Sequence, residues 1–186
     1  MLIMGPSGVG KTRVIRRLRV IDGRFTYVAP FTTRPLRNGE TDKVTVTHSH
    51  LADLNRQGKL LTVNSIYGFL YGTPKEPIEV ALRRGLFPVL DWPVSRLDVM
   101  CSFLPDQLHR VYLEPPSIGV LRGRLRDGRD PDGERLQAGL KELAALWQGY
   151  YDGLIDHRVV SVGGDEELVA RAIYGQYLTV LGLHSG

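Results

Sequence analysis

Cysteine is almost missing from this sequence of 186 residues, which contains only Cys101. One cysteine cannot form an internal disulfide, nor supply the several thiolates of a multi-cysteine zinc site. No run of about 18 apolar residues is present either, so the sequence contains no candidate membrane-spanning helix. We also expect no signal peptide, and therefore predict a cytoplasmic protein that folds around a hydrophobic core without disulfides or structural metal.

Lysine is scarce as well. The chain contains 19 arginines but only five lysines, and its formal net charge is +4. This small excess does not indicate a polyanion-binding surface, so we expect neither nucleic acid nor a membrane as a partner. Arginine binds phosphate and carboxylate with a planar fork, whereas lysine is a point charge. The bias therefore favours local binding of a small anionic ligand.

Apolar segments typical of strands alternate along the chain with segments of helical periodicity. The length favours one domain, and the alternation predicts an α/β fold, a parallel sheet covered by helices on both faces. Strands are expected over residues 1–4, 25–28, 43–47, 59–68, 86–92, 109–117 and 158–162. Helices are expected after the first strand and over residues 50–58, 77–84, 94–104, 117–125, 135–151 and 165–183.

The strongest motif follows the first predicted strand and precedes the first predicted helix. It fits G-x-x-x-x-G-K-[ST] in full, with Gly5, Pro6, Ser7, Gly8, Val9, Gly10, Lys11 and Thr12. In such a loop the backbone N–H groups surround phosphate, the lysine reaches the outer phosphates and the hydroxyl holds Mg²⁺. The helix that follows directs its positive dipole end to the same place. We therefore predict an ATP site at these residues, with Mg²⁺ held by Thr12.

Beyond this loop the sequence resembles the guanylate kinase family. The resemblance rests on MLIMGPSGVGKT, FTTRPLRNGE, YGT, VLDW, YLEPPS, RLRDGR and ERLQAGLKE, and it covers nearly the whole chain. It implies a P-loop kinase fold with a small acceptor-binding insertion and a short lid. The core would comprise residues 1–29 and 77–186, the insertion residues 30–76, and the lid about residues 125–134.

The resemblance also implies roles for individual residues. Arg34 and Arg37 would hold the phosphate of the acceptor, together with Tyr71 and Thr73. Asp91, at the end of a predicted buried strand, would orient Mg²⁺ or the acceptor. Arg124 and Arg135 would join Lys11 in holding the transferred phosphoryl group, with Arg129 inside the lid as a weaker match. The reaction would move the γ-phosphoryl of Mg·ATP to the phosphate of a small acceptor.

The sequence differs from the family at positions where family members recognise guanine. Thr62 and Pro93 stand where the family has carboxylates, and Lys43 replaces a phosphate-contacting tyrosine. Because guanine presents N–H donors, a pocket without acceptors leaves them unpaired. GMP or dGMP is the nominal acceptor, and another nucleoside monophosphate or ribose 1,5-bisphosphate is the alternative. A non-catalytic binding module is a further alternative, against which the intact Lys11 and Thr12 argue.

Two further predictions concern side chains outside these motifs. His48 and His50 are expected to share one face of a strand, but no cysteine or acid lies at ligand spacing beside them, so no metal site is predicted there. Trp147, Tyr150 and Tyr151 are expected to pack against the body of the protein.

Overall fold

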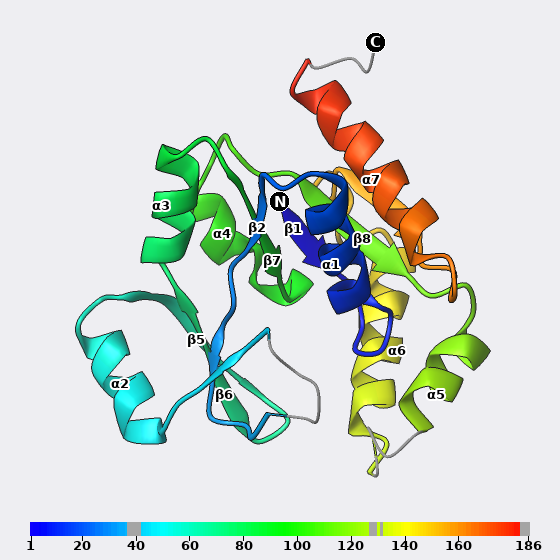
Figure 1. Ribbon diagram of the computed structural model, residues 1–186. Coiled ribbons are helices and arrows are strands. Elements are labelled where there is room, and N and C mark those ends of the chain that lie inside the picture. Colours follow the sequence, from blue (N-terminus) through cyan, green and yellow to red (C-terminus); the bar gives the residue numbers. More distant parts are fainter. Residues whose placement is uncertain (37–41, 127–129, 131, 183–186) are drawn as a thin grey trace. The chain divides into compact units, whose positions relative to one another are not determined.

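The computed structural model describes residues 1–36, 42–126, 130 and 132–182 (Figure 1). The chain divides into two compact units. The first unit comprises Met1–Gly23 and Asp91–Gly186, and the second comprises Arg24–Leu90. These boundaries differ from those implied by the family resemblance, because residues 24–29 and 77–90 group with the second unit.

Parallel strands form the centre of the first unit. They are β1 (Leu2–Met4), β8 (Arg110–Glu114) and β9 (His157–Val160), in the order β1-β8-β9. Ile3 pairs with Val111, and Val111 pairs in turn with His157. β1 is buried throughout, as is the middle of β8, which is the pattern expected of parallel strands covered on both faces.

Helices flank this sheet, which confirms the predicted α/β class with a parallel sheet. α1 packs against α7, and α5 packs against α6 (Figure 1). The helices of the first unit are α1 (Lys11–Ile21), α4 (Leu97–Phe103), α5 (Ile118–Arg126), α6 (Glu134–Trp147) and α7 (Glu166–Val180), and a 3-10 turn, η1 (Val94–Arg96), precedes α4.

Apolar side chains at helical spacing attach these helices to the sheet. In α1, Val14, Ile15 and Leu18 are buried, while the intervening arginines lie at the surface. Ser117 caps α5 as predicted, since its Oγ accepts from the Val120 N–H at 3.2 Å. Within the parts of the chain that the structure describes, no helix combines the length and apolarity needed to cross a membrane.

The second unit contains a short parallel strand pair. β2 (Phe25–Tyr27) pairs with β7 (Phe87–Asp91), whose last residue belongs to the first unit. The Phe25 and Phe87 rings meet edge to face at 5.4 Å between centroids. Between the two strands along the chain lies α3 (Glu76–Arg83), close to the predicted helix over residues 77–84.

A mixed four-stranded sheet completes the second unit, in the order β4-β3-β6-β5. Its strands are β3 (Phe31–Thr32), β4 (Val44–Thr45), β5 (Leu60–Ile66) and β6 (Phe69–Pro74). β5 and β6 form an antiparallel hairpin, of which the sequence pattern predicted only the first strand. β3 also lies outside the strands that the sequence predicts.

One helix, α2 (His48–Arg56), packs on this mixed sheet. It begins before His50, because the Thr47 side chain caps it by accepting from the His50 N–H at 3.1 Å. His48 and His50 therefore lie on a helix, where positions two apart do not share a face, and the prediction that they share a strand face is wrong.

The aromatic residues at the end of α6 also differ from expectation. Trp147 is 55% exposed and Tyr150 is 78% exposed. The prediction that these two rings pack against the body of the protein is therefore wrong. Trp147 instead lies at the surface and donates through Nε1 to Glu114 Oε2 at 3.0 Å.

Candidate phosphoryl-transfer site

The loop between β1 and α1 has a backbone that only glycine accommodates at its first position. Gly5 has φ +130°, and a Cβ there would lie 2.4 Å from the Leu113 carbonyl oxygen. Gly8 also has a positive φ, of +84°. This compact turn leads directly into α1, which begins at Lys11, so the helix N-terminus lies at the loop as the motif requires.

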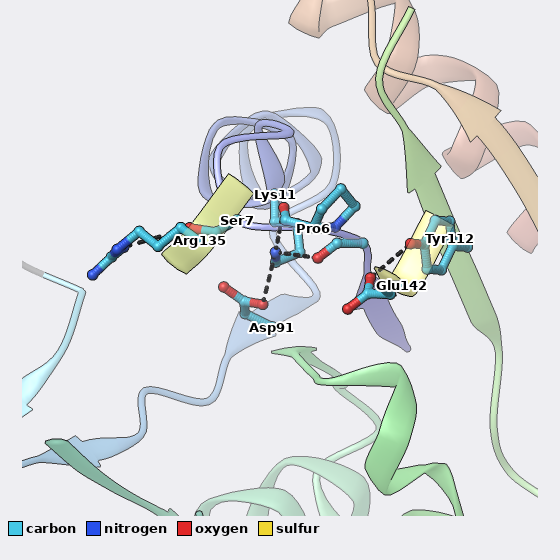
Figure 2. Close-up of polar contacts among 8 residues, drawn as sticks. Pro6, Ser7, Lys11, Asp91, Tyr112, Arg135 and Glu142 are labelled. Atoms are coloured by element: carbon cyan, nitrogen blue, oxygen red, sulfur yellow. Dashed lines mark hydrogen bonds and ion pairs between the residues drawn. The ribbon is translucent and has the colours of Figure 1, made fainter. Parts of the chain in front are cut away.

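Lys11 lies across the loop to which it belongs. Its Nζ donates to the Gly5 carbonyl at 2.6 Å and to the Pro6 carbonyl at 3.1 Å (Figure 2). Nζ also lies 3.7 Å from Asp91 Oδ1, and the Lys11 side chain is only 13% exposed. The structure therefore brings together the lysine of the motif and the acid that the sequence placed at a strand end.

The Arg124 side chain also contacts the phosphate loop, at a backbone carbonyl of the loop. One guanidinium nitrogen donates to the Val9 carbonyl at 2.8 Å, and the other donates to the Ser161 carbonyl at 3.2 Å. Burial lowers the pKa of Arg124 below its ordinary value. In this arrangement Arg124 connects the phosphate loop to the segment after β9.

Ser161 makes a second connection of the same kind. Ser161 is 3% exposed, and its Oγ donates to the Val9 carbonyl at 2.7 Å. The Val9 carbonyl therefore accepts from both Arg124 and Ser161. Two donors on one carbonyl fix the orientation of this peptide at the edge of the phosphate loop.

Arg135 approaches the loop from α6. Its guanidinium lies 3.4 Å from Ser7 Oγ, in contact with the middle of the motif (Figure 2). Asp130 fixes where this helix begins, because its two carboxylate oxygens accept from the N–H groups of Arg135 and Leu136, each at 2.9 Å. Asp130 thus performs the capping role for α6, whose N-cap residue is Gly133.

A buried hydrogen bond joins β8 to α6 next to these groups. The Tyr112 hydroxyl donates to Glu142 Oε1 at 2.6 Å, and Tyr112 is fully buried (Figure 2). Burial raises the pKa of Tyr112 and also raises the pKa of Glu142. The positive charge of Lys11 opposes the shift at Glu142, whereas the negative charge of Asp91 adds to it. Glu142 thus belongs electrostatically to the same site.

In the second unit, two of the predicted acceptor-binding residues contact each other. Arg34 Nε donates to the Tyr71 hydroxyl at 3.2 Å, and Arg34 is 6% exposed. The Lys43 ammonium lies 5.8 Å from the centroid of the Tyr71 ring. Two cationic side chains therefore flank one phenol, an arrangement suited to a phosphate group.

Neutral polar side chains share one face of the β5–β6 hairpin. Thr62 pairs with Thr73 and Asn64 pairs with Tyr71, and residues directly opposite in an antiparallel pair point to the same side. Thr62 is 7% exposed, and its hydroxyl donates to Asn64 Oδ1 at 3.3 Å. None of these four residues is a carboxylate, so the hairpin offers hydroxyl and amide groups to a ligand.

Comparison of the sequence with known families gives a match that covers most of the chain. The guanylate kinase family profile matches residues 1–161. The chain belongs to the guanylate kinase family. Guanylate kinase of Gluconobacter oxydans is 31% identical over 170 residues, covering 87% of this chain and 78% of that protein. Guanylate kinase of Carboxydothermus hydrogenoformans is 32% identical over 165 residues, covering 83% of this chain and 78% of its own length.

Solved structures agree on the fold. The crystal structure of guanylate kinase from Anaplasma phagocytophilum superposes with a TM-score of 0.75 at 19% identity, covering 100% of this chain and 87% of that one. Shikimate kinase from Acinetobacter baumannii gives a TM-score of 0.52 at 18% identity, covering 96% and 92% of the two chains. The predicted P-loop kinase fold is therefore confirmed. The family match and the curated relatives, rather than these structures, show that the protein is a phosphotransferase of the nucleoside monophosphate kinase class.

The predicted site residues divide into three groups in the structure of this guanylate kinase family member. Lys11, Asp91, Arg124 and Arg135 lie around the phosphate loop, and Arg34 and Tyr71 lie together in the second unit. Arg37 and Arg129 lie outside the described residues, as do four positions of the predicted lid, residues 127–129 and 131. Thr12 lies in the first turn of α1, and Thr73 is buried on β6.

Three residues that the fold brings to this site were not predicted from the sequence, namely Asp130, Glu142 and Ser161. The sequence could have indicated Glu142, because this residue follows Arg135 by seven positions on a predicted helix and so lies on the same helix face. Asp130 and Ser161 gave no such indication, since one lies in a polar loop and the other directly follows the short strand β9.

Proposed function

We propose that this protein transfers the γ-phosphoryl group of Mg·ATP to the phosphate of a small acceptor, with GMP or dGMP as the nominal acceptor. The observation that carries this proposal is the arrangement of Lys11, Asp91 and Arg135 around an intact phosphate loop. Phosphoryl transfer depends on placement and charge neutralisation more than on covalent chemistry by the protein. Fixed cations at the loop supply that neutralisation.

Lys11 is held close to the position where it would act. In this structure it donates to two loop carbonyls and pairs with Asp91. We infer that the β- and γ-phosphates of ATP replace the two loop carbonyls as acceptors for Lys11, because a phosphate oxygen carries more charge than a backbone carbonyl. Arg135 would add a second cation from α6.

The oxygen donors beside the loop suit Mg²⁺. The Thr12 hydroxyl and the Asp91 carboxylate are hard ligands of the kind that Mg²⁺ takes, alongside water and phosphate oxygens. Bound there, the ion would neutralise charge on the ATP phosphates. Thr12 would hold the ion directly, while Asp91 would orient it or its waters.

We assign the acceptor phosphate to Arg34 and Tyr71, with Arg37 and Thr73 as further contacts. A second candidate acceptor is favoured by the hairpin face that bears Thr62, Asn64 and Thr73, because these neutral groups do not supply the paired carboxylates suited to the guanine donors. That candidate is another phosphorylated small molecule, such as ribose 1,5-bisphosphate or a different nucleoside monophosphate.

The test is an acceptor panel with Mg·ATP and the purified protein. The panel comprises GMP, dGMP, AMP, CMP, UMP and ribose 1,5-bisphosphate, with Lys11→Ala as the inactive control. Turnover of at least one acceptor by the wild type, lost in Lys11→Ala, supports the proposal. Selective turnover of GMP or dGMP would show that Thr62 does not prevent guanine recognition. ATP binding without turnover of any acceptor would contradict phosphoryl transfer and favour a binding module.

A further inference from the structure

A single stripe of α6 runs along the phosphate loop. Arg135, Gly139 and Glu142 are separated by four and then three positions, so they lie on one face of the helix. Arg135 contacts Ser7, and Gly139 lies so close to Pro6 that a Cβ at this glycine would be 3.1 Å from the proline Cβ. Two successive turns of α6 therefore touch two successive residues of the loop.

The last member of the stripe is anchored from the sheet. Tyr112 comes from the middle of β8, and its hydroxyl holds the Glu142 carboxylate at 2.6 Å (Figure 2). The neighbouring residue on β8, Leu113, also limits the loop, because its carbonyl lies against Gly5. One strand therefore fixes both the start of the loop and the position of the helix beside it.

We propose that Glu142 is a positioning residue for phosphoryl transfer, which acts through Tyr112 to set the register of α6 so that Arg135 meets the phosphate loop. Sliding or rotating α6, even by part of a turn, would move the Arg135 guanidinium away from Ser7. The close approach of Gly139 to Pro6 sets the distance between helix and loop, and the Tyr112–Glu142 hydrogen bond sets the register. This inference rests on the phosphoryl transfer proposed above.

The experiment compares four variants with the wild type, namely Glu142→Ala, Glu142→Gln, Tyr112→Phe and Arg135→Ala, together with the Glu142→Ala/Arg135→Ala double variant. Lys141→Gln, at the exposed neighbouring position of α6, is the matched control. Melting temperature, kcat, and KM for ATP and for the acceptor are measured for each protein, using the acceptor from the panel with the highest turnover.

We expect Glu142→Ala to lower kcat about tenfold while the acceptor KM stays unchanged. A misplacement of about 1 Å can cost ~100-fold in rate, and the remaining contacts of α6 limit the displacement of Arg135 to less than that. Glu142→Gln should retain most of the wild-type kcat, because the amide oxygen of the glutamine still accepts from Tyr112. Tyr112→Phe should lower kcat in the same direction, and it provides the test if Glu142→Ala does not fold. In the Arg135→Ala background, Glu142→Ala should change kcat less than about twofold, because the effect passes through Arg135.

Equal kcat losses from Glu142→Ala with and without Arg135 would overturn the inference, and so would unchanged kcat in both Glu142→Ala and Tyr112→Phe. If the wild type turns over no acceptor, the proposed function fails, and the same cycle is then measured as the Kd for Mg·ATP. In that case, a higher Kd for Mg·ATP in Glu142→Ala that is seen only when Arg135 is intact supports the register role. Additive changes in Kd, or none, would overturn it.

Discussion

Lys11 Nζ lies 3.7 Å from Asp91 Oδ1 and donates at the same time to the Gly5 carbonyl at 2.6 Å. The lysine is therefore held over its own loop by a charge from the end of β7 and by the backbone at the start of the loop. Such a held lysine loses little conformational freedom when phosphate replaces these partners. The pair thus explains how the site is organised before ATP binds.

Replacing Lys11 by alanine should abolish this organisation. We expect kcat to fall about 100-fold or more, because a fixed cation that stabilises the transferred charge is lost. The fold should persist, since the side chain lies at the edge of the loop and is not part of the apolar core. Steady-state kinetics of Lys11→Ala beside Lys141→Gln test this, and near-normal turnover in Lys11→Ala would remove the phosphate loop from the mechanism.

Tyr71 offers a mild test of the acceptor site. Its hydroxyl accepts from Arg34 and lies on the hairpin, so Tyr71→Phe removes one hydrogen-bonding group without a large change in volume. We expect the acceptor KM to rise about tenfold with unchanged KM for ATP, since a hydrogen bond to a charged group contributes ~1.5 to 3 kcal/mol. Tyr150→Phe, which changes an exposed tyrosine, is the control. A change confined to the ATP KM would refute the assignment.

Substitution of Thr62 tests whether the missing carboxylate at this position limits selectivity for guanine. Thr62→Glu places a carboxylate on the hairpin face, where it can accept from guanine N–H groups. We expect kcat/KM for GMP to rise about tenfold relative to AMP, which corresponds to pairing donors whose burial otherwise costs ~1 to 3 kcal/mol. Thr62→Gln matches the size without the charge and should produce a smaller change. An unchanged GMP to AMP ratio in a folded Thr62→Glu protein would show that this face does not contact the base.

His109 gives the first unit a predictable response to acid. It is 2% exposed, its ring centroid lies 5.0 Å from that of His157 and 5.2 Å from that of Tyr177, and burial lowers its pKa to about 4. The charges of His157, Arg110 and the Met1 amino group act in the same direction, and Asp156 opposes them. The native state therefore favours the neutral imidazole.

Since an unfolded histidine has a pKa near 6.5, the unfolded chain binds the proton first as the pH falls. We expect the free energy of unfolding to decline by up to ~3 kcal/mol between pH 6.5 and pH 4 through this residue. Chemical denaturation at several pH values measures this decline. His109→Phe should flatten the curve over that interval, and an equally steep curve in His109→Phe would assign the acid sensitivity to other groups.

The phosphate loop was predictable because its chemistry demands a fixed spacing between strand and helix. Glycine, lysine and threonine positions in that motif specify both the local backbone and the ligand. Arg34 and Tyr71 were predictable only through resemblance to a family, since the 37 positions that separate them conceal their contact. The buried strand ending at Asp91 was evident from its apolar run, which is typical of parallel strands.

The second unit was less predictable, for local physical reasons. β6 contains Gly72 within the YGT segment, and no strand was predicted there because glycine interrupts a strand pattern. The structure instead uses Gly72 for close packing, because a Cβ would lie 2.7 Å from the Leu51 side chain of α2. His48 and His50 were wrongly predicted to share a strand face, because the Thr47 side chain caps a helix that already begins at His48. Contacts between distant residues, such as Tyr112 with Glu142, leave no periodic trace in the sequence.

The most direct test of the account follows the γ-phosphate itself. ATP carrying a radiolabelled γ-phosphate is incubated with Mg²⁺, the protein and each acceptor, and the products are separated. We predict label on the phosphate of an acceptor, formed in equal amount with ADP by the wild type and lost in Lys11→Ala. Label that appears only as inorganic phosphate, or transfer that persists in Lys11→Ala, would contradict it.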